Sequence, residues 1–142
     1  MSLSVLILAA GKGSRMNSAF PKVLQKLAGR PMIDYVLTIA KKLTRKVIVI
    51  VGSQQEMLRQ HLAGEQIEFV EQRQQFGTGH AVAQALPQLS DKGAVLILSG
   101  DVPLLTDEIV SRLIDCGSSC DVAVLTSNLD SPGGYGRIIR DK

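Results

Sequence analysis

Five short runs of apolar residues restrict the fold of this chain more than any other feature of its sequence. They are rich in Val and Ile, and they occupy positions 5–9, 47–51, 67–70, 94–98 and 122–125. Four of them contain no polar residue, unlike a strand with one solvent-facing side, whereas the run at 67–70 includes Glu68. Short continuous runs of this kind are typical of strands buried on both faces of a parallel sheet. The run at 67–70 is the weakest of the five.

Helical patterns lie between these runs. Apolar residues recur at helical spacing in 33–43, 81–89 and 109–114, and more weakly in 55–62. Thr106 is predicted to cap the third of these helices, with acidic residues following it in the first turn. Alternating strands and helices predict an α/β sandwich of three layers. The 142 residues contain no repeat or linker, so one domain spanning 1–142 is expected.

Composition excludes several classes of function. A net charge of +3, few aromatic residues and no Trp argue against nucleic-acid binding. No apolar run approaches the ~20 residues that cross a bilayer, so no membrane partner is expected and a cytoplasmic location is predicted. Cys116 and Cys120 have no further Cys or His cluster to complete a zinc site, and they are interpreted as buried apolar side chains.

The glycine-rich stretch after the first run is a candidate phosphate-binding loop. It reads LAAGKGSRM at 8–16 and is followed by Pro21-Lys22. A dinucleotide fingerprint would need a third small residue where Met16 stands, and a Walker loop would need four residues between its glycines. A triphosphate loop with the cations Lys12, Arg15 and Lys22 remains, alongside an ordinary turn with solvated charges.

A carboxylate is predicted at the same edge of the sheet. The sequence SGDVP places Asp101 directly after the run at 94–98. Ligands of open α/β sheets bind at the carboxyl ends of the strands, and a carboxylate there is a natural Mg²⁺ ligand. A turn or helix-capping role for Asp101 is the alternative.

Four motifs in order give the chain a family resemblance. LAAGKGSRM with PKVL, FGTGHA, GDVPL and GYGR resemble the uridylyltransferase domain of the bacterial GlmU enzymes, over about 5–140. The resemblance implies a Rossmann-like three-layer fold of the nucleotide-diphospho-sugar transferase type, with a mostly parallel sheet. It also implies a Mg²⁺-dependent enzyme that converts UTP and N-acetylglucosamine 1-phosphate into UDP-N-acetylglucosamine and pyrophosphate.

The resemblance assigns roles to individual residues. Arg15 and Lys22 would neutralise the phosphates as catalytic cations, Asp101 would hold Mg²⁺, and Gly136 would contact the phosphate of the amino sugar. Gln72, Gly77 and Thr78 would recognise uracil and ribose. The complete set of expected nucleotide contacts is Leu8, Ala9, Ala10, Gly11, Gln72, Gly77, Thr78, Ser99 and Gly100.

Two positions depart from the family, and the two histidines have structural interpretations. Ser99 stands where Tyr is usual, and Phe76 stands where Leu is usual. His80 is interpreted as a cap of the helix that starts near Gly79. His61 is interpreted as a surface residue of a helix.

Family members also continue well beyond the segment that matches GYGR. They add a Glu and two Asn that complete the acceptor and metal sites, and then an acetyltransferase β-helix. We therefore expect a nucleotidyltransferase domain that is incomplete at its C-terminal side and has no β-helix. Nucleotide binding is expected to survive better than catalysis, and uncovered sheet edges predict a homo-oligomer. The alternatives are a non-catalytic nucleotide-binding or interaction module, and a transferase for another nucleotide or sugar.

Overall fold

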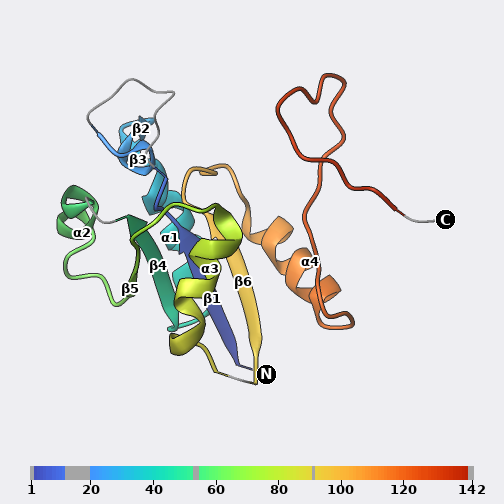
Figure 1. Cartoon of the computed structure of the whole chain (residues 1–142), viewed down its shortest axis with the longest axis horizontal. Coiled ribbons are helices and arrows are strands. Elements are labelled where there is room, and N and C mark those ends of the chain that lie inside the picture. The colour runs from blue at the N-terminus through green and yellow to red at the C-terminus, as the bar shows by residue number, and fades with distance from the viewer. Residues whose placement is uncertain (1, 12–19, 53–54, 91, 141–142) are drawn as a thin grey trace.

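A four-stranded parallel sheet forms the centre of the molecule (Figure 1). The computed structural model describes residues 2–11, 20–52, 55–90 and 92–140. Within the sheet the strands lie in the order β5 (Glu68–Gln72), β4 (Val47–Gly52), β1 (Leu3–Leu8) and β6 (Ala94–Ser99). All three pairings are parallel, and Leu8 aligns with Ile50 on one side and with Ser99 on the other. The carboxyl ends of the strands therefore meet at one edge.

Helices cover both faces of the sheet. α1 (Met32–Leu43), α2 (Glu56–His61) and α4 (Asp107–Gly117) contribute side chains to the core on one face. α3 (Thr78–Ala85) packs on the opposite face and continues into a 3₁₀ turn at Leu86–Gln88. In Figure 1, α3 lies on the near side of the sheet and α1 on the far side. The predicted three-layer α/β sandwich is confirmed.

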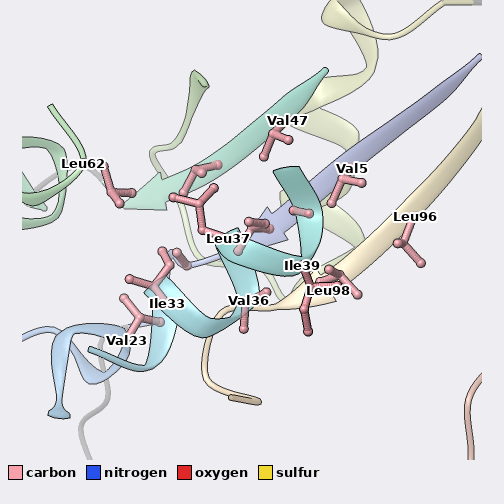
Figure 2. Close-up of a cluster of buried hydrophobic side chains, with 14 of the residues drawn as sticks. Val5, Val23, Ile33, Val36, Leu37, Ile39, Val47, Leu62, Leu96 and Leu98 are labelled. Atoms are coloured by element: carbon pink, nitrogen blue, oxygen red, sulfur yellow. The ribbon is translucent and has the colours of Figure 1, made fainter. Parts of the chain in front are cut away.

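Alternate residues of each central strand enter different cores, which explains the unbroken apolar runs. Val5 and Ile7 pack toward α1, whereas Leu6 packs toward α3. Every residue of β4 is buried. Figure 2 shows the layer between α1 and the strands, where Val36 and Leu37 of the helix lie against the sheet. Strands buried on both faces have no position at which a polar residue would meet water.

A small hairpin precedes α1, and no pattern in the sequence predicted it. A 3₁₀ turn at Lys22–Leu24 leads into β2 (Lys26–Leu27), which pairs antiparallel with β3 (Arg30–Pro31). The two turn residues between these strands both have positive φ angles, 49° and 81°, and the second is a glycine. Tight hairpins need such angles because they match the twist of the strands. The hairpin anchors the segment that carries Lys22.

The predicted strand at 122–125 is wrong. The structure describes no strand after α4, and the segment runs away from the sheet as an extended tail (Figure 1). Val122 is 77% exposed, and Val124 and Leu125 are also exposed. Val favours the pleated, half-buried surface of a sheet, but a segment rich in Val forms a strand only where a neighbouring strand offers backbone hydrogen bonds. In the described chain the outer edge of β6 pairs with no strand.

The cysteines also differ from expectation. Cys116 and Cys120 are free thiols, but both are exposed and not buried. They follow the part of α4 that reaches the core, where Val110 is the buried contact. The Thr106 cap is confirmed, because its side chain accepts a hydrogen bond from the amide of Ile109. Among the helices described, none has the length and apolar character needed to cross a bilayer.

Candidate functional site

A cavity of about 380 Å³ opens at the carboxyl edge of the sheet. The ends of β1, β5 and β6 contribute to its wall, together with the start of α3 and the 3₁₀ turn at Lys22–Leu24. A volume of this size suits a small-molecule ligand. The lining residues are Leu8, Ala9, Ala10, Gly11, Lys22, Val23, Gln72, Gln75, Gly77, Thr78, Ala81, Ser99 and Asp101. Most of the residues predicted for the site therefore lie on one cavity.

The loop after β1 is held at its start by hydrogen bonds across the sheet. The amide of Ala9 donates to the carbonyl of Ile50 at 2.9 Å. The side chain of Gln75 donates from Nε2 to the carbonyl of Ala10 at 2.5 Å. Gly52 stands beside this contact, and a Cβ there would lie 3.2 Å from that carbonyl oxygen and 3.4 Å from Gln75 Nε2.

Gln75 is a site residue that the sequence analysis missed. It lies in a polar run, EQRQQ, where nothing distinguishes one glutamine from the next. Its contact with Ala10 joins two segments that are 65 residues apart in the chain. It therefore connects the loop after β1 to the segment after β5, and both of these segments line the cavity.

Gln72 ends β5 as a buried polar residue with 3% exposure. Its Nε2 donates to the carbonyl of Gly77 at 3.0 Å and lies 3.0 Å from Nδ1 of His80. Gly77 has a φ of +96°, a conformation that glycine adopts without strain. The segment after β5 thus folds back so that Gln72 and Thr78 line the same cavity.

His80 does not cap the helix, contrary to the interpretation from sequence. The N-cap of α3 is Gly77, and no side chain caps that helix. The His80 ring instead contacts Gln72 through Nδ1, and it lies edge-on to the Phe76 ring with centroids 5.3 Å apart. His61 is on the surface as predicted, where its Nε2 lies 2.7 Å from a carboxylate oxygen of Asp34.

Lys22 and Asp101 form an ion pair in the wall of the cavity. Lys22 Nζ donates to a carboxylate oxygen of Asp101 at 2.6 Å, although 79 residues separate them in the chain. Their side chains are 41% and 33% exposed. The two groups predicted to hold phosphate and metal are therefore adjacent, and both remain accessible to a ligand.

Comparison with known protein families identifies the family of this chain. The profile of the MobA-like NTP transferase domain matches residues 5–137. The chain belongs to this family. It is 51% identical to "Bifunctional protein GlmU" of Francisella tularensis subsp. novicida (strain U112) over 143 residues, covering 100% of this chain and 31% of that protein. It is 52% identical to the protein of the same name from Stutzerimonas stutzeri (strain A1501), covering 99% of this chain and 31% of that protein.

The predicted resemblance to the GlmU enzymes is confirmed by these relatives, although the chain spans less than a third of their length. Solved structures agree on the fold. A nucleotidyl transferase from Methanothermobacter has a TM-score of 0.67 and 19% identity, over 80% of this chain and 56% of that one. Rv0371c of Mycobacterium tuberculosis H37Rv, in complex with manganese, has a TM-score of 0.66 and 20% identity, over 82% and 60%. At these identities the likeness concerns the fold alone.

Gly100 has a packing role in this MobA-like transferase domain. The Gly100 amide donates to the carbonyl of Leu8 at 2.9 Å. This hydrogen bond uses the only N–H group of Gly100. A Cβ at this position would lie 3.1 Å from the Leu8 oxygen and 3.2 Å from a methyl group of Val23. Glycine therefore lets the end of β6 approach β1 closely, and Asp101 follows directly at the cavity.

Three predicted residues are not placed in the cavity, namely Gly100, Arg15 and Gly136. Arg15 lies outside the described residues, as does Lys12. Gly136 belongs to the exposed segment after α4 and does not line the cavity. Its role toward the amino-sugar phosphate stays a prediction, as does the role of Arg15 toward the nucleotide phosphates.

The cavity fits a divalent cation that arrives with a nucleotide better than a cation bound by protein alone. Asp101 supplies one accessible carboxylate, and the described residues contain no group of three or more His, Cys, Asp or Glu that could hold a metal. Mg²⁺ usually keeps several waters and takes one or two carboxylates together with substrate phosphates. One accessible carboxylate beside the ammonium group of Lys22 matches that pattern.

Proposed function

We propose that this domain binds UTP in the cavity and transfers its uridylyl group to N-acetylglucosamine 1-phosphate. One observation carries the proposal: the loop after β1, the Gln72–Thr78 segment and the Lys22–Asp101 pair converge on a single cavity. A site for a nucleoside triphosphate needs a backbone surface against which the nucleotide lies, polar groups that recognise the base, and charged groups that bind the phosphates. Similarity to the GlmU proteins supports the choice of nucleotide and acceptor.

Each part has a distinct task in this proposal. The small residues of the loop after β1 let the nucleotide lie close to the backbone. Gln72 and Thr78 face the base and the ribose, because both line the cavity beside the start of α3. Lys22, with Arg15, neutralises the triphosphate, since ammonium and guanidinium groups bind phosphate through charge-assisted hydrogen bonds.

The proposed reaction is a single in-line displacement. A phosphate oxygen of N-acetylglucosamine 1-phosphate forms a bond to the α-phosphorus of UTP. The bond from that phosphorus to the oxygen bridging it to the β-phosphorus breaks, and pyrophosphate leaves with the electron pair. No covalent enzyme intermediate is needed, so positioning and charge neutralisation supply the acceleration.

Asp101 would hold Mg²⁺ at the phosphates in this proposal. The bound ion would polarise the α-phosphoryl group and screen the charge of the triphosphate. Lys22 moves from the Asp101 carboxylate toward phosphate oxygens when the nucleotide enters. Gly136 is proposed to approach the acceptor phosphate through its backbone.

Calorimetric titration of UTP with Mg²⁺ into the protein tests the binding step, with CTP as control. Saturable heat with UTP and a much weaker response with CTP are the expected results. Release of pyrophosphate on addition of N-acetylglucosamine 1-phosphate then tests transfer. Binding without pyrophosphate release would favour a non-catalytic nucleotide-binding module, and an absence of binding to either nucleotide would refute the proposal.

A further inference from the structure

The side-chain amide of Gln72 uses both hydrogens of its nitrogen inside the protein. Nε2 donates to the carbonyl of Gly77 and contacts Nδ1 of His80, each at 3.0 Å. An amide NH₂ group carries two hydrogens, so these two acceptors occupy it fully. The amide oxygen accepts no hydrogen bond from the described residues, and it is not among their fully buried unpartnered atoms. The oxygen is therefore the group that Gln72 offers to the cavity.

The contact with Gln72 also indicates which tautomer the neutral His80 ring adopts. Because Gln72 Nε2 brings a hydrogen to it, Nδ1 must carry a lone pair, and the neutral ring then holds its proton on Nε2. The side-chain amide of Gln84 lies beside Nε2, with its nitrogen 3.3 Å away. The same Gln84 nitrogen donates to the backbone carbonyl of His80 at 3.4 Å. The edge-on contact with Phe76 also restrains the ring.

We propose that His80 is a positioning residue that determines which base the cavity accepts. It acts through Gln72, whose amide it holds with the oxygen toward the ligand. If the amide turned by 180°, its oxygen would face the Gly77 carbonyl and the His80 lone pair, and both contacts would be repulsive. His80 supplies one of the two acceptors that oppose this rotation.

The orientation of the amide distinguishes uracil from cytosine. N3 of uracil carries a hydrogen that can be donated to the Gln72 oxygen, whereas N3 of cytosine carries a lone pair that the oxygen would repel. A rotated amide would instead present its NH₂ group, which suits cytosine. This inference rests on the proposed function, because it requires a pyrimidine nucleotide in the cavity with this edge toward Gln72.

Variants of His80 test the inference through selectivity. His80→Leu removes the acceptor, and the ratio of the dissociation constant for CTP to that for UTP should fall roughly five- to tenfold, as expected for one neutral hydrogen bond. His80→Asn returns an acceptor oxygen and should recover much of the ratio. His61→Leu changes the other histidine, outside the cavity, and should leave the ratio unchanged. Calorimetry with UTP and CTP in the presence of Mg²⁺ gives all of these values.

Two results would overturn the role of His80. One is a folded His80→Leu protein with the wild-type ratio, and the other is a folded protein that loses affinity for both nucleotides equally. The ¹⁵N shifts of the His80 ring in the unmodified, nucleotide-free protein provide a measurement that needs no variant. A protonated Nε2 with an acceptor Nδ1 is expected, and a proton on Nδ1 would refute the geometry. If the unmodified protein binds neither nucleotide, the proposed function fails, while the ring shifts still decide the His80–Gln72 contact.

Discussion

Replacing Lys22 should change metal binding and nucleotide binding in opposite directions. In the structure, Lys22 Nζ lies 2.6 Å from the Asp101 carboxylate, so the lysine occupies the group proposed to hold the cation. Lys22→Met removes this competitor and leaves Asp101 free for a cation. The same change removes one of the positive charges proposed to bind the triphosphate. A purely structural lysine would weaken both events or neither.

The geometry sets the size of both effects. The side chains of the pair are 41% and 33% exposed, so solvent screening limits its stabilising contribution to about 1 kcal/mol or less. Lys22→Met should therefore tighten binding of Mn²⁺ alone by at most about fivefold. A charge-assisted hydrogen bond contributes about 1.5–3 kcal/mol, and the exposure favours the lower value, so affinity for Mg²⁺–UTP should fall roughly tenfold.

Two measurements check this prediction. The electron paramagnetic resonance signal of free Mn²⁺ reports metal binding without nucleotide, and calorimetry reports Mg²⁺–UTP binding. Lys42→Met is a matched control, because Lys42 Nζ lies 2.6 Å from an Asp107 carboxylate oxygen on an exposed surface. The control should alter neither affinity. Unchanged nucleotide affinity in Lys22→Met, or weaker binding of Mn²⁺ alone, would refute the reasoning.

Three further predictions concern other parts of the molecule. Gly100→Ala should lower the free energy of unfolding by about 1–3 kcal/mol in urea titrations, because the new Cβ would lie 3.1 Å from the Leu8 carbonyl oxygen. Unchanged stability would mean that the end of β6 can move. Gln75→Ala should weaken UTP binding about fivefold through loss of the bond to Ala10, with kinetics separating KM from kcat. An unaltered KM would contradict a role in shaping the cavity. Ile97, 46% exposed on β6, should support self-association, and Ile97→Lys should shift light-scattering masses toward the monomer. A wild-type protein that is already monomeric would exclude that role.

Much of the fold follows from local patterns in the sequence. The runs at 5–9 and 47–51 are apolar at every position, and both form central strands that contribute buried residues to both faces of the sheet. The run at 122–125 has similar composition but forms no strand in the described chain. Composition describes the surroundings that a segment prefers, whereas a strand also needs a neighbour with free N–H and C=O groups.

The candidate site divides in the same way. The sequence by itself made Lys22 and Asp101 candidates for the charged groups of the site, because they belong to the motifs PKVL and GDVPL. Their pairing, the contact of Gln75 with Ala10 and the contact of His80 with Gln72 were decided only by the tertiary structure. Residue type and spacing report which face of an element is buried. Hydrogen-bond partners depend on which strands lie side by side and how each loop folds back, and the pairs here span up to 79 residues.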